Sequence, residues 1–229
     1  IDIDGTANLD VVDIDGAVDM ASTLGVTGAA TFSSTINSAA IVSGITNFTQ
    51  GLLISQDGGT GTLSSANRNT GFGYEVFDDL TSGDDNTGLG NQALSKLTSA
   101  AENVAIGSNA LETNTTGNSN TAVGMNALTL LDGSANNTAI GTYSLATNAS
   151  GATNTAVGRS SLRYTTTASN NTAVGAYVMN ANTTGEYNTV VGAYAGDALT
   201  EADYNTAVGY LALSTDTLGA NNTALGSAA

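Results

Sequence analysis

The sequence predicts an all-β fold: a β-solenoid, either a parallel β-roll or a β-helix, whose coils are 17 residues long. Three observations predict it. The motif Asn-Thr-Ala-Val-Gly recurs ten times, and each copy starts 17 positions after the one before. Glycine closes every copy, and polar turn residues dominate the stretches between copies. A period kept without insertion or deletion is typical of stacked units that contact only their two neighbours.

Two regions follow from the distribution of these repeats. Residues 1–65 carry turn-like glycines at Gly5, Gly16 and Gly28, each followed four positions later by an apolar residue. Such short strands cannot bury their own apolar sides, so we expect an intertwined, β-prism-like arrangement of several chains. Residues 66–229 hold the 17-residue repeats. Because the chain starts at Ile1 and stops within a repeat, we expect a fragment or processed product whose solenoid is truncated at its C-terminal end.

Within each coil, the motif predicts a short strand. The fourth copy shows the positions on which a coil depends: Asn120, Thr121, Ala122, Val123, Gly124 and Leu128. Because side chains alternate along a strand, the second and fourth positions share one face and the third lies on the other. The fourth position is apolar in every copy, so we expect the second and fourth positions to face the coil interior. The third position is restricted to Gly, Ala and Val, which predicts close packing against a neighbouring chain.

The other fixed positions predict a corner, a second core residue and a ladder. Glycine at the fifth position is expected where the chain turns with positive φ or passes close to another backbone. Four positions later an apolar residue predicts a second interior side chain, with Gly196 as the exception. The invariant asparagines predict a hydrogen-bonded ladder along the stack, with ligand binding as the alternative. Helical solenoids are excluded, because their units exceed about 30 residues.

Composition restricts the possible functions. The 229 residues include 4 basic and 20 acidic ones, a net charge of -16, which argues against nucleic acid or an anionic membrane as partner. The chain has no Cys and no His, so thiol chemistry and the commonest general base are missing. No apolar run approaches the ~20 residues of a membrane span. We expect no catalysis, no cofactor and no membrane insertion.

Two groups of carboxylates are candidate sites. Asp2, Asp4, Asp13 and Asp15 alternate with apolar residues before glycines, a spacing that suits a hard cation such as calcium. The same alternation is typical of a strand with one exposed face, and we expect no metal site there. The pairs 78–79 and 84–85 lie at variable loop positions, where carboxylates are more often solvated than catalytic.

Tyrosines at the seventh position of their units form a third candidate site. Tyr143, Tyr177 and Tyr194 share this position, the last two in adjacent coils. We expect a ladder of stacked rings that stabilises one edge; a strip on which carbohydrate stacks is the alternative.

The motif at residues 103–107, Asn-Val-Ala-Ile-Gly, resembles the repeat of the trimeric autotransporter adhesin head. That resemblance implies a left-handed parallel β-roll of which three copies associate side by side. It also implies that Val104 and Ile106 face the coil interior and that Ala105 faces the neighbouring chain.

Residues 24–34, LGVTGAATFSS, instead resemble repeats of bacteriophage tail fibres and related virion proteins. The function expected from this is the structural shaft of a viral tail fibre or appendage that positions a host-receptor-binding tip. The alternatives are a bacterial trimeric surface adhesin head and, last, an ice-binding solenoid, since the threonines are expected inside. The expected partners are two further copies in a parallel homotrimer, other virion or appendage proteins, and a host-surface glycan or protein contacted through a tip beyond Ala229. The expected location is the virion, or the extracellular or cell surface.

Overall fold

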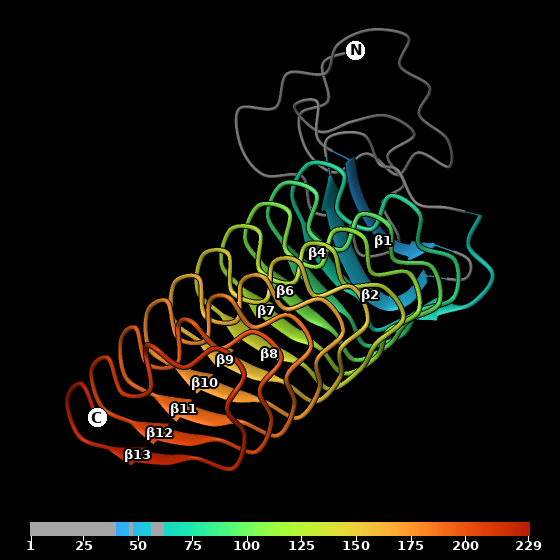
Figure 1. Ribbon diagram of the computed structural model, residues 1–229. Coiled ribbons are helices and arrows are strands. Elements are labelled where there is room, and N and C mark those ends of the chain that lie inside the picture. The colour runs from blue at the N-terminus through green and yellow to red at the C-terminus, as the bar shows by residue number, and fades with distance from the viewer. Residues whose placement is uncertain (1–39, 46–47, 56–61) are drawn as a thin grey trace, which may run out of the picture. The chain divides into compact units, whose positions relative to one another are not determined.

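The computed structural model describes residues 40–45, 48–55 and 62–229, all within the compact unit Ser34–Ala229. These residues form one 13-stranded sheet and contain no helix (Figure 1). The strands are β1 (Ala40–Ile45), β2 (Phe48–Ser55), β3 (Ala66–Asn67), β4 (Thr70–Phe72), β5 (Thr87–Leu89), β6 (Val104–Ile106), β7 (Thr121–Val123), β8 (Thr138–Ile140), β9 (Thr155–Val157), β10 (Thr172–Val174), β11 (Thr189–Val191), β12 (Thr206–Val208) and β13 (Thr223–Leu225). In the part of the chain that is described, no helix is long and apolar enough to cross a membrane.

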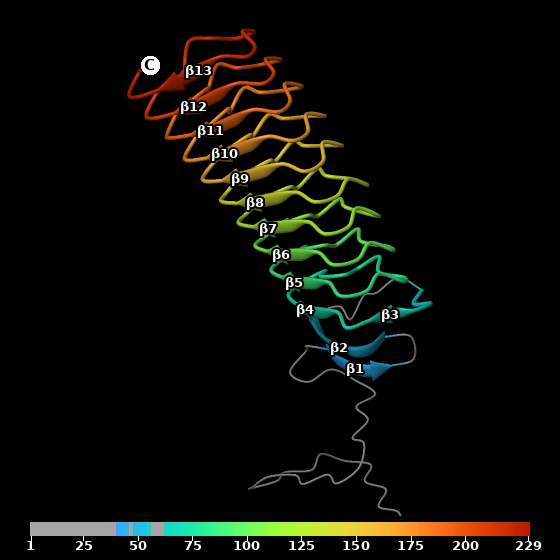
Figure 2. The same ribbon diagram turned by 90° about the horizontal axis from the view of Figure 1, so that it is seen from below.

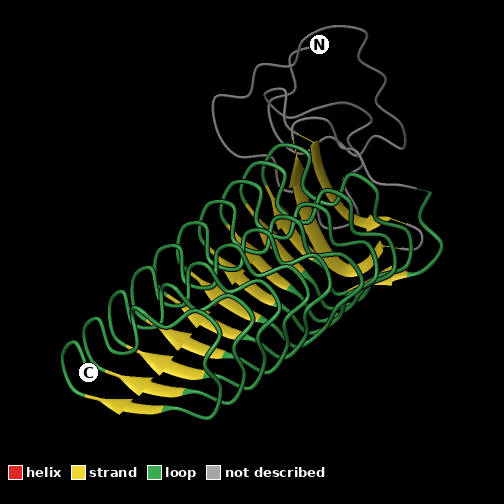
Figure 3. Cartoon of the chain, in the orientation of Figure 1, coloured by secondary structure: helices red, strands yellow, loops and turns green. Residues whose placement is uncertain are grey.

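Strands β4 to β13 stack in parallel, one strand for each coil (Figure 2). Within these strands every residue pairs with the residue 17 positions later, as Thr172 does with Thr189. Backbone hydrogen bonds continue beyond the strands, for example from the Leu162 N–H to the Val178 carbonyl at 3.0 Å. Figure 3 shows the strands together on one side of the coils and loops completing the remainder. The predicted parallel β-solenoid of 17-residue coils is therefore confirmed.

The sheet begins before the first repeat. Strand β2 pairs in parallel with β4, and β1 pairs with β2 in the antiparallel direction. Leu53 of β2 pairs with Gly71 and is buried like the third residue of the motif. The glycines at 5, 16 and 28, on which the β-prism-like arrangement depends, lie outside the described residues, so that arrangement stays a prediction.

The corners of each coil use left-handed backbone, as the glycine pattern predicted. Gly158 has a φ of 129°, and a Cβ placed on it would lie 2.3 Å from the carbonyl oxygen of Gly175. The ninth position also has positive φ, which is uncommon for a bulky residue: Leu162 has a φ of 51°. Glycine tolerates this conformation best, which accounts for the exception at Gly196, whose φ is 54°.

The predicted direction of the strand side chains is wrong. The third position is buried inside the coil in nine of its ten copies, two of which are glycines, and is half-buried in the last; Ala122, Ala139, Ala156 and Ala173 are 0% exposed within a single chain. The second and fourth positions, including Val104 and Ile106, point outward and are half-buried or exposed. The third position therefore packs against the interior of its own coil and not against a neighbouring chain.

The cause is the narrowness of the coil interior. Its space is taken by side chains at the eighth, ninth and twelfth positions, such as Val76, Phe77 and Leu80, all fully buried. A Cβ on Gly71 would lie 2.5 Å from Val76 and 2.9 Å from Phe77, so this coil has no room even for alanine. With the opposite wall occupied by large side chains, the strand can contribute only a small one, and its bulky aliphatic residues must point outward.

The asparagine ladder is confirmed. Each asparagine at the first position accepts, through its side-chain oxygen, a hydrogen bond from the backbone N–H of the next asparagine along the stack. Its side-chain nitrogen donates to the carbonyl at the fifteenth position of its own coil, as from Asn154 to Ala168 at 2.8 Å. The ladder thus joins neighbouring coils and also closes each coil, which satisfies buried polar groups that would otherwise be costly.

Candidate functional site

The outward side chains of strands β4 to β13 form one continuous surface, which we call the sheet face. Its second-position residues are Thr70, Thr87, Val104, Thr121, Thr138, Thr155, Thr172, Thr189, Thr206 and Thr223. Its fourth-position residues are Phe72, Leu89, Ile106, Val123, Ile140, Val157, Val174, Val191, Val208 and Leu225. Because the strands are in register, each row is straight, with a rise of about 4.8 Å per coil.

The fourth-position row is a continuous apolar feature of the described surface. Phe72 is 56% exposed and Ile140 is 40% exposed, although each of these side chains has an in-register aliphatic neighbour on the adjacent strand. The row contains no polar residue in any coil. A row of this length, running from β4 to β13, is larger than the scattered exposed apolar residues of ordinary soluble surfaces.

Tyrosines at the seventh position of their coils contact one another or arginine side chains. The rings of Tyr177 and Tyr194 stack with centroids 5.2 Å apart, which confirms the predicted ladder for these two. Tyr143 instead lies under the guanidinium of Arg163, at 4.7 Å. Arg159, one coil before Tyr177, lies 5.5 Å from the centre of its ring. With a neighbour on each side, the ring of Tyr177 is poorly placed to stack on a sugar.

A second tyrosine pair was missed by the sequence reasoning. Tyr187 and Tyr204 precede the motif asparagine in adjacent coils and stack at 5.0 Å with an interplanar angle of 2°. Their shared position, the seventeenth, is visible in the sequence and would have identified them. Like Tyr177 and Tyr194, their rings pack face to face between adjacent coils, so they too stabilise the stack of coils.

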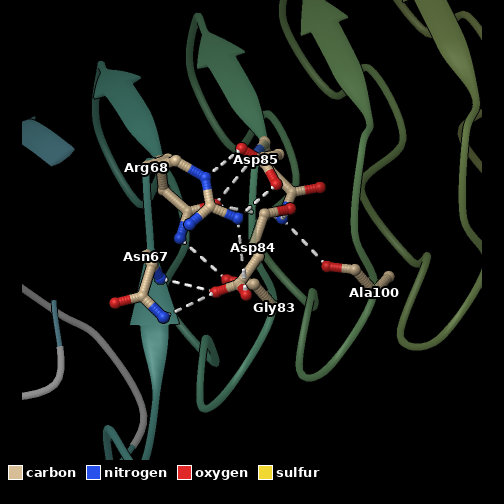
Figure 4. Close-up of polar contacts among 8 residues, drawn as sticks. Asn67, Arg68, Gly83, Asp84, Asp85 and Ala100 are labelled. Atoms are coloured by element: carbon tan, nitrogen blue, oxygen red, sulfur yellow. Dashed lines mark hydrogen bonds and ion pairs between the residues drawn. The ribbon is translucent and has the colours of Figure 1, made fainter. Parts of the chain in front are cut away.

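The carboxylates at 84 and 85 are held by residues of the preceding coil (Figure 4). Asp84 accepts hydrogen bonds from the backbone and side-chain nitrogens of Asn67 at 2.6 and 3.2 Å. Asp85 accepts two from the guanidinium of Arg68, both at 2.6 Å, and this pairing lowers the pKa of Asp85. Carboxylates bonded in this way fasten one coil to the next and are poorly suited to proton transfer.

The four candidate metal ligands all precede the described part of the chain. Asp2, Asp4, Asp13 and Asp15 all lie outside the described residues. Among residues 62–229 and the two described strands before them, no group of three or more acidic side chains is arranged to hold a metal ion.

The interior contains polar side chains at the twelfth position of several coils. Asn148 forms two hydrogen bonds with the backbone of Gly151, each 2.8 Å long. Thr165 occupies the equivalent place one coil later; its hydroxyl is buried and has no hydrogen-bond partner among the residues that the structure describes. This position holds leucine in other coils, such as Leu131. The side chains at the twelfth position therefore fill the coil interior and are not accessible from the surface.

The second and fourth positions of the motif lie on the outer surface and not inside the coil as predicted. The sequence nevertheless contains a signal for this direction. The third and ninth positions compensate each other in size. Gly71 at the third position occurs with the large Phe77 at the ninth, and the larger Val190 at the third occurs with Gly196 at the ninth. This compensation of volume predicts that the third and ninth positions meet inside the coil, which leaves the second and fourth outside.

Comparison with protein-family models, with curated protein sequences and with solved structures finds no match for this chain.

Proposed function

We propose that this chain is the structural shaft of a fibre, such as a viral tail fibre or a comparable appendage, and that it holds a receptor-binding tip at a fixed distance. The observation that carries the proposal is the unbroken register from β4 to β13. All nine strand pairs are parallel with an offset of 17 residues, without a bulge or an inserted residue. A stack of equal coils sets length and stiffness, and its surface is repetitive rather than specialised.

The asparagine ladder supports this role because it resists bending and shearing between coils. Each rung joins two coils through a backbone donor and, in most rungs, a side-chain donor, as between Asn137 and Asn154, and all rungs except the last, half-buried one at Asn222 are buried. The Arg68–Asp85 ion pair and the stacked tyrosines also join neighbouring coils. We propose a parallel homotrimer as the functional assembly, located on a virion or at a cell surface, with other virion or appendage proteins at its ends.

A non-catalytic role is part of the proposal. The carboxylate pair at 84 and 85, which the sequence offered as an acid/base candidate, is engaged by Asn67 and Arg68. Contact with a host-surface glycan or protein is assigned to the tip and not to these coils.

A bacterial trimeric surface adhesin head is the alternative, and it would use the same coils. Ice binding is the second alternative, and one observation now favours it more than the sequence did: the threonines of the sheet face point outward. The fourth-position row argues against it, because its side chains vary from Phe72 and Leu89 to Val157, and a surface that matches a crystal lattice needs a uniform row.

Deletion of whole coils tests the shaft. Removal of residues 120–153 takes out two complete units and joins Ser119 to Asn154, which keeps the register. We expect a folded rod that is shorter by about 9.6 Å, measured by small-angle X-ray scattering or electron microscopy.

The matched control removes residues 120–145, one and a half units, and should disrupt the stack. If removal of the two whole units abolished host attachment by a rod that is still folded and keeps its distal end, the deleted coils would themselves be a binding site. The shaft proposal would then be wrong.

A further inference from the structure

The sheet face differs from the remaining surface in charge. The chain carries a net charge of -16, yet no charged residue occupies the second or fourth position in any of the ten copies. Every carboxylate within residues 62–229 falls between the seventh and seventeenth positions of its unit. The acidic side chains therefore lie on the loops, and the face of the strands is free of them.

We propose that the sheet face is the surface through which copies of this chain pack against one another, in parallel and in register. The inference rests on the proposed function and deepens it, because it names the face by which the shaft assembles. The repeat pattern predicts this contact at the third-position alanines, but these lie inside the coil.

Charge is the first argument for a second copy as the occupant. Two copies that approach through their loops bring carboxylates of like sign together, which costs free energy in partly desolvated contacts. Two copies that approach through their sheet faces bring together threonine and apolar side chains only. Within residues 62–229 the sheet face is thus a surface that another copy can contact without opposing carboxylates.

Periodicity is the second argument. A partner must offer apolar contacts every 4.8 Å or so over about 43 Å, the length of nine coil-to-coil steps. Another copy of the same face has this spacing along its whole length. Its aliphatic side chains stand perpendicular to the sheet, so that rows from different copies can interdigitate like the inner faces of packed sheets.

Register gives a test of the direction of packing. In a parallel assembly about an axis along the rod, Ile106 of one copy lies near Ile106 of the next. In an antiparallel pair, Ile106 of one copy would instead meet Val191 of the other, since these are the third strands from opposite ends of the β4–β13 stack. The absence of cysteine from the chain makes a cysteine introduced at either position a clean reporter.

The experiment combines crosslinking of the full chain with sedimentation velocity. Ile106→Cys, treated under native conditions with a bis-maleimide crosslinker that spans about 10 Å, is expected to form intermolecular crosslinks, because packed sheet faces lie about 10 Å apart. Thr116→Cys, exposed at the fourteenth position of the same coil, is the matched control and should remain uncrosslinked. Wild type should sediment as an oligomer at micromolar concentration.

Charge placed on the face should prevent the contact. In the Ile106→Cys background, the pair Val157→Asp and Val174→Asp is expected to reduce the crosslinked fraction at least tenfold without loss of strand signal in circular dichroism. The pair Thr167→Asp and Thr184→Asp adds equal charge to exposed loop positions of the same two coils and should leave the crosslink intact.

Three results would overturn the proposal. One is a folded wild-type monomer at micromolar concentration. Another is an oligomer in which Ile106→Cys alone does not crosslink, whether or not it crosslinks with Val191→Cys. The third is a folded monomer that changes the shape of growing ice crystals and loses this activity on Thr155→Lys. The sheet face would then bind ordered water and not a second copy. Rod length in the coil-deletion experiment does not depend on crosslinking, so the shaft and the assembly face can fail separately.

Discussion

The side-chain oxygen of Asn137 accepts hydrogen bonds from both the backbone nitrogen and the side-chain nitrogen of Asn154, at 3.0 and 3.2 Å. The side-chain oxygen of Asn154 in turn accepts from Asn171, and its nitrogen donates to the Ala168 carbonyl. One amide thus satisfies buried polar groups in three coils.

Asn154→Ala should therefore be strongly destabilising. It leaves the backbone N–H of Asn171 and the carbonyl of Ala168 buried without these partners, and each such group costs about 1–3 kcal/mol. We expect a loss of several kcal/mol in the free energy of unfolding, measured by denaturant titration. Asn222→Ala, in the half-buried last rung, is the control and should cost clearly less. Equal losses would mean that the ladder adds little to stability.

Ala156→Leu and Val157→Leu test the direction of the strand side chains. Ala156 is fully buried in a filled interior, so the larger side chain should overpack it and cost about 1–3 kcal/mol or more. Val157 faces outward, and leucine already occupies the equivalent place at Leu89, so this change should stay within about 0.5 kcal/mol. Thermal unfolding of the two variants compares them directly, and the reverse order of stability would contradict the outward sheet face.

Much of this fold could be predicted from the sequence, because strict periodicity fixes which residues of neighbouring coils meet. The parallel register, the glycine corners and the asparagine ladder all follow from it. Periodicity alone could not tell which side of the strand faces inward, since alternation at Thr155, Ala156 and Val157 is compatible with both directions. That choice depends on the width of the interior, and the assumption that bulky aliphatic residues lie inside fails where the opposite wall already supplies Leu162.

Val190 and Gly196 should be energetically coupled, because the larger third-position residue occurs in the coil that lacks a ninth-position side chain. Val190→Ala alone should cost about 2 kcal/mol through the cavity it leaves. Gly196→Leu alone should overpack the coil and cost about 1–3 kcal/mol. The double variant restores the pattern of the other coils and should lose at least about 1 kcal/mol less than the sum. Simple additivity in this double-mutant cycle would show that the two positions do not share one space.

Thr165→Val should stabilise the chain. The Thr165 hydroxyl is buried without a partner among the described residues, and valine has nearly the same shape without the polar atom. We expect a gain of about 1 kcal/mol in the free energy of unfolding. Thr166→Val is the control: the exposed Thr166 donates to the Thr183 carbonyl at 3.1 Å, so its replacement should bring no gain. A loss of stability in Thr165→Val would indicate that the hydroxyl has a favourable partner.

Asp197→Asn should change stability in a way that depends on pH. Burial raises the pKa of the Asp197 carboxyl above its ordinary value of 3.8, although backbone hydrogen bonds at Asp197 and Ala198 oppose the shift. Between the unfolded and the raised folded pKa, the folded chain binds more protons, so the free energy of unfolding falls as the pH rises through this range. Above the range the wild type bears the full cost of the half-buried charge.

The asparagine variant lacks that cost and should be more stable than wild type at neutral pH, by about 0.5 kcal/mol or less because the site is partly solvated. The advantage should shrink as the pH falls through the raised pKa and vanish below the ordinary one, where the wild-type carboxyl is protonated in both states. Denaturant titrations from pH 3 to pH 7 measure the difference. Glu201→Gln, exposed in the same coil, controls for the loss of one negative charge. A variant less stable than wild type at neutral pH would show that the backbone hydrogen bonds to the carboxylate outweigh its desolvation.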